Sequence, residues 1–263
     1  MLTARDVEQK IYAWAAKEYQ MDWDNTGLLC GREEKEVQRI LVALDPTFDV
    51  CEEAAKIGAD LLVTHHPLIF QPLRRVTDRD AAGKALICLI EHGIAAINAH
   101  TNLDQAVGGV NDWLAEILQL RDIEVPAPCG VAADGRPWGL LRCGNVDEVP
   151  LREFAAAVKE KLACPGLRIL DCGCPVRRVA VGGGACADEL ETVRAAGCDT
   201  FVTADVKYHQ FQDAQHLGIN LIDAGHFETE NPICLRLADY LRRSFPEAEV
   251  LLSKKHGDPV QFI

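Results

Sequence analysis

Two adjacent histidines, His65 and His66, directly follow a short apolar run at residues 61–64. Such a run is typical of a parallel strand that is covered on both faces. Ligands bind beyond the carboxyl ends of strands in open α/β sheets, and histidine is the most common metal ligand in proteins. Because neighbouring side chains diverge, we expect the two imidazoles to bind two metal ions rather than one. The alternative interpretation is a capped turn with two solvated histidines.

Further ligand-type side chains follow two other predicted strands, at residues 94–98 and 219–223. Asp104 comes after the first of these strands, and His226 and Glu230 come after the second. Because His226 and Glu230 are four residues apart, a helical turn would place them on one face, where they can chelate together. Taken singly, each carboxylate has an ordinary interpretation, Asp104 as a helix cap and Glu230 as a solvated carboxylate in the first turn of a helix.

Together, these five side chains are three imidazoles and two carboxylates, with no thiolate among them. Closed structural zinc sites usually contain cysteine, so this set favours a catalytic centre. Five side chains cannot saturate two ions, and the remaining coordination positions are open to water or substrate. This is the composition of a hydrolytic two-metal site, in which the reacting group is metal-activated water. Zinc, manganese, iron, cobalt and nickel all suit these ligands.

The bulk properties of the 263 residues indicate a globular protein without a membrane span. A net charge of −13 argues against a broad nucleic-acid surface, because such a surface carries a basic excess. No apolar stretch approaches the ~20 residues that a spanning helix needs. Residues 3–19 predict an amphipathic helix capped by Thr3 rather than a signal peptide. The 11 cysteines are odd in number and irregularly spaced, which predicts reduced thiols in the cytoplasm.

Strands and helices alternate along the chain, which predicts an α/β fold with parallel sheets. Strands are predicted at 39–44, 61–64, 94–98, 178–181, 200–203, 219–223 and 249–253. Helices are predicted at 49–57, 82–92, 110–118, 151–162, 188–196, 208–217 and 232–245. The segment 121–139 is rich in proline and glycine and is the best candidate for a boundary. We therefore expect a first α/β half at residues 1–125 and a second at 126–263.

The two halves also resemble each other in sequence. Residues 39–64 align without gaps onto residues 178–203, and GADLLVT in the first half corresponds to GCDTFVT in the second. The order of matching motifs favours a duplication over generic α/β similarity. His65 and His66 fall opposite Ala204 and Asp205, which indicates a specialised site in the first half.

The chain resembles the Nif-three-like family of dinuclear-metal hexameric proteins, whose members are often labelled GTP cyclohydrolase I type 2 homologs. Five motifs carry the resemblance: WDNTGL at 23–28, THHPLIF at 64–70, AHTNLD at 99–104, DVKYH at 205–209 and DAGHFETE at 223–230. The resemblance implies that His65, His66, Asp104, His226 and Glu230 bind two divalent metal ions, with Glu230 touching both. It also implies duplicated, pseudo-symmetric and intertwined three-layer α/β halves, assembled as a ring-shaped homohexamer.

The function that follows is a metal-dependent hydrolase acting on a nucleotide or a related small phosphorylated molecule. The family label suggests ring opening of GTP with formate release, and hydrolysis of a phosphate ester is the nearest rival. A metal-handling or regulatory protein without turnover is the second hypothesis. A ring that binds nucleic acid is the third, and the net charge of −13 counts against it.

Several other polar residues have open interpretations. The segment 23–27 either lines the site or forms a tight turn with a buried tryptophan. Asp205 and Lys207 are candidates for substrate binding, or they are solvated residues at a helix N-terminus. His100 and His209 are candidate helpers in proton transfer. The glycines at 182–184 form either a phosphate loop or, as we expect, a tight strand-to-helix turn.

Overall fold

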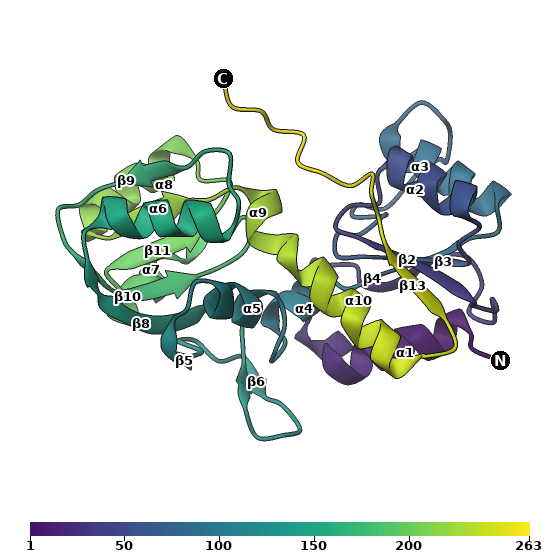
Figure 1. Cartoon of the computed structure of the whole chain (residues 1–263), viewed down its shortest axis with the longest axis horizontal. Coiled ribbons are helices and arrows are strands. Elements are labelled where there is room, and N and C mark those ends of the chain that lie inside the picture. The colour runs from purple at the N-terminus through teal and green to yellow at the C-terminus, as the bar shows by residue number, and fades with distance from the viewer. The chain divides into compact units, whose positions relative to one another are not determined.

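The apolar runs of the sequence form the central strands of two sheets, one in each of the two units into which the chain divides (Figure 1). The structure is a computed structural model that describes all 263 residues. Unit 1 comprises Met1–Ala106 and Ile233–Gly257, and unit 2 comprises Val107–Pro232 and Asp258–Ile263. The chain therefore crosses between the units before residue 125 and returns to unit 1 near its end, so the units differ from the expected division into residues 1–125 and 126–263.

Unit 1 contains a five-stranded sheet in the order β1-β4-β3-β2-β13. Its strands are β1 (Gly27–Cys30), β2 (Arg39–Ala43), β3 (Leu61–Thr64), β4 (Ala95–Asn98) and β13 (Glu249–Leu252). Its helices are α1 (Ala4–Trp14), the short 3-10 helix η1 (Lys17–Tyr19), α2 (Phe48–Ile57), α3 (Ala81–Glu91), α4 (Thr101–Gln105) and α10 (Pro232–Ser244).

Both faces of this sheet are covered, as the apolar runs predict. Leu62 and Ala96 pack with α2 and α3 on one face. Helices α1 and α10 lie on the other side of the sheet, where the Trp14 and Tyr240 rings have centroids 4.8 Å apart (Figure 1). Thr3 caps α1, and its hydroxyl accepts a hydrogen bond from the Asp6 amide, which confirms the predicted N-terminus of this helix. Unit 1 is therefore a three-layer α/β unit.

Unit 2 contains a six-stranded sheet in the order β5-β8-β10-β11-β12-β9, and a separate hairpin. Its sheet strands are β5 (Arg121–Glu124), β8 (Arg142–Val149), β9 (Arg168–Leu170), β10 (Val176–Val181), β11 (Thr200–Thr203) and β12 (Asn220–Asp223), and the hairpin pairs β6 (Gly130–Val131) with β7 (Pro137–Trp138). Its helices are α5 (Val110–Ile117), α6 (Leu151–Lys161), the 3-10 helix η2 (Ala187–Glu189), α7 (Leu190–Ala195), α8 (Tyr208–Leu217) and α9 (His226–Glu230).

Helices also cover both faces of the unit 2 sheet. Leu114 of α5 and Phe154 of α6 pack with Val179 and Val202 on one face. Leu190 of α7 and Ala214 of α8 pack with Phe201 on the other. Across both units, the longest helix is α10 with 13 residues. No helix has both the length and the apolar character that a membrane crossing requires.

The prediction of parallel sheets is right for the central strands and wrong for other parts of both sheets. Strands β2, β3 and β4 are parallel, as are β10, β11 and β12. Strands β1, β8 and β9 run antiparallel to a neighbour, and β5 is antiparallel to β8. We missed these segments because they lack a continuous apolar pattern. Strands β1 and β8 mix buried with more exposed residues, and all four residues of β5 are exposed.

The predicted boundary at residues 125 and 126 is also wrong, because pairing across the sheets overrides the local composition. Helix α5 packs in the core of unit 2 although it precedes the segment rich in proline and glycine. At the other end of the chain, β13 pairs in parallel with β2, which places Val250 beside Ile40 in unit 1. Such long-range pairing leaves no mark in a local pattern.

Candidate metal centre

Three histidines of unit 1 gather at the carboxyl ends of β3 and β4. His65 and His66 follow β3 directly, and His100 precedes α4 just after β4. The potential ligand atoms of the three imidazoles all lie within 4.8 Å of one another. His65 is fully buried, and His66 and His100 are partly buried. Because β3 and β4 are paired, with Thr64 beside Asn98, the residues that follow them must meet at one edge of the sheet.

Each of these imidazoles is held through Nδ1. His65 Nδ1 lies 2.8 Å from the carbonyl oxygen of Ala99. His66 Nδ1 lies 2.6 Å from Asp45 Oδ1, and His100 Nδ1 lies 2.8 Å from Asp24 Oδ1. These oxygens only accept, so each Nδ1 carries the proton and donates it, which leaves the lone pair on Nε2. Proteins orient metal-binding histidines in this way.

Asp104 adds a carboxylate to the same edge of unit 1. It lies on α4, is buried, and places Oδ1 3.5 Å from His65 Nε2. Unit 1 therefore brings together three of the five predicted ligands, His65, His66 and Asp104, and adds His100. Sequence reasoning treated His100 only as a helper, although its position after the neighbouring strand was a signal that it would join the group.

Asp24 fixes His100, and the pKa of its carboxylate is shifted. Burial by itself would raise the pKa of Asp24, but hydrogen bonds from His100 and Thr101 and the charge of His100 lower it from 3.8 to about 2. The Thr101 amide donates to Asp24 Oδ2 over 3.0 Å. The carboxylate therefore stays ionised and joins the turn before β1 to the start of α4.

We expect the Asp24→Asn substitution to lower the free energy of unfolding by about 2 kcal/mol near pH 7. The folded pKa of Asp24 lies below its ordinary value, so its stabilisation is present above pH 4 and is lost as the pH falls toward 2. Urea denaturation of both proteins at pH 7 and at pH 3 measures this. A difference in unfolding free energy that stays constant between the two pH values would contradict the assignment.

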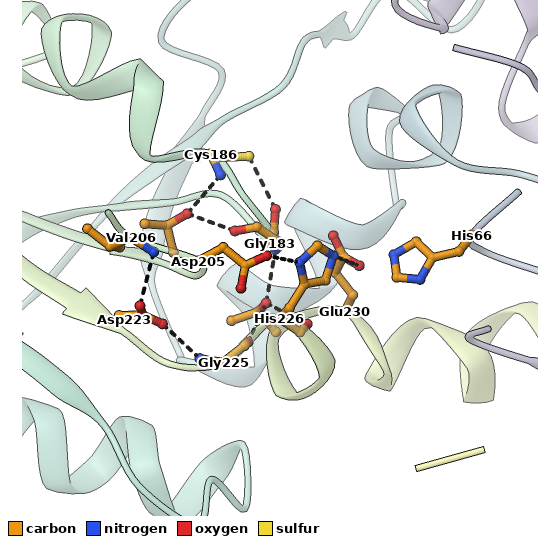
Figure 2. Close-up of polar contacts among 12 residues, drawn as sticks. His66, Gly183, Cys186, Asp205, Val206, Asp223, Gly225, His226 and Glu230 are labelled. Atoms are coloured by element: carbon orange, nitrogen blue, oxygen red, sulfur yellow. Dashed lines mark hydrogen bonds and ion pairs between the residues drawn. The ribbon is translucent and has the colours of Figure 1, made fainter. Parts of the chain in front are cut away.

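Unit 2 presents a second pair of ligand-type side chains, on α9. His226 Nε2 lies 3.0 Å from Glu230 Oε2, and His226 Nδ1 lies 2.7 Å from Asp205 Oδ2 (Figure 2). The predicted helical turn over these residues is confirmed, because α9 spans His226–Glu230. Asp205 accepts the proton of Nδ1, so His226 also offers Nε2 as its ligand atom. Glu230 is buried, with its carboxylate beside that nitrogen.

Asp205 positions His226 in unit 2. It occupies the place that aligns with His66 in the sequence comparison of the two halves, and it has a φ of 52°, in the left-handed region. Asparagine tolerates this conformation, so Asp205→Asn should keep the backbone but weaken the acceptor for His226 Nδ1. We expect metal affinity to fall about 10- to 100-fold, measured by competition with a chelator. Asp213→Asn on α8 is the control, and equal affinity in the two variants would contradict the role of Asp205.

The glycine turn after β10 makes room for His226 and Glu230 rather than binding phosphate. The amides of Gly182, Gly183 and Gly184 already donate to Val202 O, Asn111 Oδ1 and Thr229 Oγ1 over 3.0, 2.7 and 3.0 Å. A phosphate loop needs free amides, so our expectation of a tight strand-to-helix turn is correct. Gly184 has a φ of 63°, and a Cβ there would overlap Glu230 Oε1 and lie 3.1 Å from His226 Nε2.

The remaining predicted site residues lie elsewhere in unit 2. Lys207 precedes α8 and donates its backbone amide to Gln210 Oε1 over 2.7 Å. His209 lines a cavity of about 240 Å³ together with Asp213 and His216. The groups of potential ligand atoms contain neither His209 nor any cysteine.

The chain is similar to proteins of known family over nearly its whole length. A family model described as Duf34/NIF3 (NGG1p interacting factor 3) matches residues 2–259. A protein of Streptomyces coelicolor named GTP cyclohydrolase 1 type 2 homolog is 39% identical over 255 residues, 94% of this chain and 89% of that protein. A Clostridium perfringens protein with the same name is 33% identical over 248 residues, which are 92% of this chain and 92% of that protein.

Solved structures with the same fold are also available for comparison. The crystal structure of a Bacillus cereus protein related to NIF3 matches with a TM-score of 0.93 at 26% sequence identity, covering 100% of this chain and 99% of that one. A Staphylococcus aureus hypothetical protein matches with a TM-score of 0.90 at 29% identity, covering 99% of both chains. These similarities include the residues of both units.

Proposed function

This chain belongs to the Duf34/NIF3 family, and from that premise we propose that it is a metal-dependent hydrolase for a nucleotide or a related small phosphorylated molecule. We propose further that His65, His66 and Asp104 of unit 1 act together with His226 and Glu230 of unit 2 to bind two divalent metal ions. Glu230 would be a ligand of both ions. The metal is zinc, manganese, iron, cobalt or nickel.

The observation that supports this proposal best is the common arrangement of the four imidazoles. Each imidazole places Nδ1 against an oxygen, which leaves Nε2 as the nitrogen that can bind a metal ion. This holds for His65, His66, His100 and His226. A carboxylate lies beside Nε2 of His65 in unit 1 and of His226 in unit 2. The Nδ1 contact alone does not mark a metal ligand, because His92 has one as well. The clustering of His65, His66 and His100 and the carboxylates beside Nε2 set these imidazoles apart, so the residues fit the ions that the family resemblance implies.

The chain's own residues would prepare the site for hydrolysis. Two bound divalent ions would activate water and polarise the bond that is cleaved. Asp45 and Asp205 keep the ligand imidazoles in one tautomer and one orientation. His100, with its Nδ1 proton directed to Asp24, can accept a proton at Nε2, which is the task of a general base. His209 remains a candidate for proton transfer. Asp205 and Lys207 remain candidates for substrate binding.

Two hydrolytic reactions fit such a centre. Ring opening of GTP, which the names of the relatives suggest, hydrolyses both bonds to guanine C8, consumes two water molecules and releases that carbon as formate. Hydrolysis of a phosphate ester would use the same activated water. Incubation of metal-loaded protein with GTP and with phosphoesters, under each of the five metals, tests the proposal by release of formate or phosphate.

The same experiment decides between turnover and metal handling. Protein that contains close to two ions per chain and releases either product supports the hydrolase. Full metal content without turnover under any metal would replace the hydrolase by a metal-handling or regulatory protein. Binding to DNA that persists at high salt would instead support a nucleic-acid-binding ring.

For the assembly, we propose a toroidal homohexamer of a cytoplasmic protein, with two pseudo-symmetric and intertwined halves in each chain. The support is the family resemblance and the parallel trios β2-β3-β4 and β10-β11-β12, which occur in the same order along the chain. Light scattering after size exclusion measures the mass of the particle. A monomer or dimer at micromolar concentration would contradict the hexamer without affecting the metal assignment.

A further inference from the structure

Two aromatic side chains beside the histidines of unit 1 are exposed to solvent. Trp23 is 59% exposed and Phe70 is 45% exposed, each taken as a whole residue. Their ring centroids lie 5.8 Å apart, with the ring planes at 70°. Both rings also lie edge to face with the imidazole of His100, at 6.1 Å for Trp23 and 6.3 Å for Phe70. The alternative interpretation of residues 23–27, a tight turn with a buried tryptophan, is therefore wrong about the burial of Trp23.

The exposed aromatic pair is continuous with the metal-binding imidazoles. The centroid of His100 lies 5.3 Å from that of His65 and 5.6 Å from that of His66. A continuous group of rings thus begins at the two predicted ligands, of which His65 is buried, continues through His100, and ends in two exposed apolar rings. A molecule that reaches the ligands of unit 1 has these rings within reach.

The turn that carries Trp23 is fastened on several sides, so its exposure does not come from a loose loop. The Asp24 side chain is fully buried and accepts hydrogen bonds from His100 and from the Thr101 amide. Asn25 Nδ2 donates to the Ile69 carbonyl oxygen over 2.7 Å, which joins this turn to the residue before Phe70. Asn98 Nδ2 donates to the Asn25 carbonyl oxygen over 3.1 Å.

Single exposed apolar side chains are common on protein surfaces and need no explanation. Here, two aromatic rings are exposed together and stand beside a polar cluster able to bind metal. The segments that carry them are joined by the hydrogen bond from the Asn25 side chain to the Ile69 carbonyl oxygen. Pockets for small molecules combine these features, since apolar rings supply contact area and a few fixed polar groups supply chemistry. A flat ring can stack on one of the two aromatic faces and meet the edge of the other.

We propose that Trp23 and Phe70 form the binding subsite for a planar heteroaromatic ring of the substrate, the base of a nucleotide. The inference rests on the proposed function and makes it more specific, because it separates nucleotides from other phosphorylated molecules. The subsite selects for the aromatic ring, and the sugar and phosphate contribute no contact to it. Aromatic stacking tolerates any base, so this subsite favours nucleotides as a class over sugar phosphates.

The test uses the full-length, metal-loaded protein with GMP as the probe and ribose 5-phosphate as the matched compound without a base. Trp23 is the exposed tryptophan of the chain, so binding of GMP should quench tryptophan fluorescence. We expect Trp23→Ala and Phe70→Ala to weaken GMP binding about 10-fold each. Binding of ribose 5-phosphate and metal content should remain as in the parent protein. The affinities of these alanine variants are measured by calorimetry.

Two further variants make the result decisive. Trp23→Phe retains an aromatic ring, so it should keep most of the GMP affinity while losing the fluorescence signal. Phe48→Ala on α2 removes another exposed aromatic ring of unit 1. It should change neither the affinity for GMP nor the fluorescence signal. Equal GMP affinity in the parent protein and Trp23→Ala would overturn the subsite, as would equal affinity of the parent for GMP and ribose 5-phosphate.

The outcome is distinguishable from failure of the proposed function. If no metal supports turnover but the binding differences appear, the hydrolase is wrong and the base subsite holds. If turnover appears and KM for the nucleotide is the same in Trp23→Ala as in the parent, the hydrolase holds and the subsite is wrong.

Discussion

The Glu230→Gln protein is expected to lose both metal ions and to lose metal-dependent turnover by about a thousandfold or more. Glu230 is buried, and its carboxylate lies beside His226 Nε2. Glutamine keeps the shape of the side chain but removes the negative charge and one of the two oxygens that a bridging ligand needs. His65→Ala should remove one ion only, because this imidazole serves a single ion. Elemental analysis of the purified proteins gives the number of ions per chain.

His92→Ala is the matched control for these two substitutions. His92 is also an imidazole of unit 1 and holds Nδ1 2.8 Å from the Cys88 carbonyl oxygen, but it is not part of the ligand groups. Its removal should leave the metal content at that of the parent protein. If Glu230→Gln retains both ions, the bridging role is wrong, and if His65→Ala also retains both, the assignment of the centre is wrong.

The second large effect is expected from Gly184→Ala, which adds a single methyl group. That methyl would overlap Glu230 Oε1 and crowd His226 Nε2, so the pair would have to move away from the position in which it can bind metal. We expect unit 2 to remain folded and the protein to lose most of its bound metal and its turnover. Metal content and circular dichroism, measured on the same preparation, separate loss of ligand geometry from loss of fold.

Gly197→Ala supplies the control for backbone strain. Gly197 has a φ of 71°, close to that of Gly184, and a Cβ there would meet nothing within 4 Å. Both substitutions place an alanine in the left-handed region, which costs about 1–2 kcal/mol. The two variants should therefore lose similar stability, while only Gly184→Ala loses metal. Normal metal binding by Gly184→Ala would show that Glu230 and His226 are not confined by this turn.

Much of the candidate centre can be predicted from the sequence because its main side chains obey local rules. The run at Leu61–Thr64 marks a covered strand, and residues directly after such a strand must lie at its carboxyl end, which places His65 and His66. The spacing of His226 and Glu230 predicts one helical face, and α9 has that form. Both predictions follow from the repeat of side-chain direction along a strand or a helix, which can be read from a short segment of sequence.

The groups that orient those side chains could not be predicted in the same way. Asp45 and Asp24 lie in turns with no periodic pattern, and each reaches a histidine far along the chain. The tight turn at residues 182–184 was expected from the sequence, but its hydrogen-bond partners Asn111 and Thr229 could not be named. Trp23 is exposed although tryptophan is usually buried to a large extent, and no local pattern in this loop predicts that.

The sequence by itself therefore determined which side chains can bind metal, the apolar strands that carry them, and the α/β class. The tertiary structure decided the tautomers of the imidazoles, the space that Gly184 leaves for Glu230, and the membership of β13 in unit 1. The physical reason is the range of the interactions. Strand and helix periods are local, whereas a hydrogen bond between distant turns or a strand added from the other end of the chain depends on the folded arrangement as a whole.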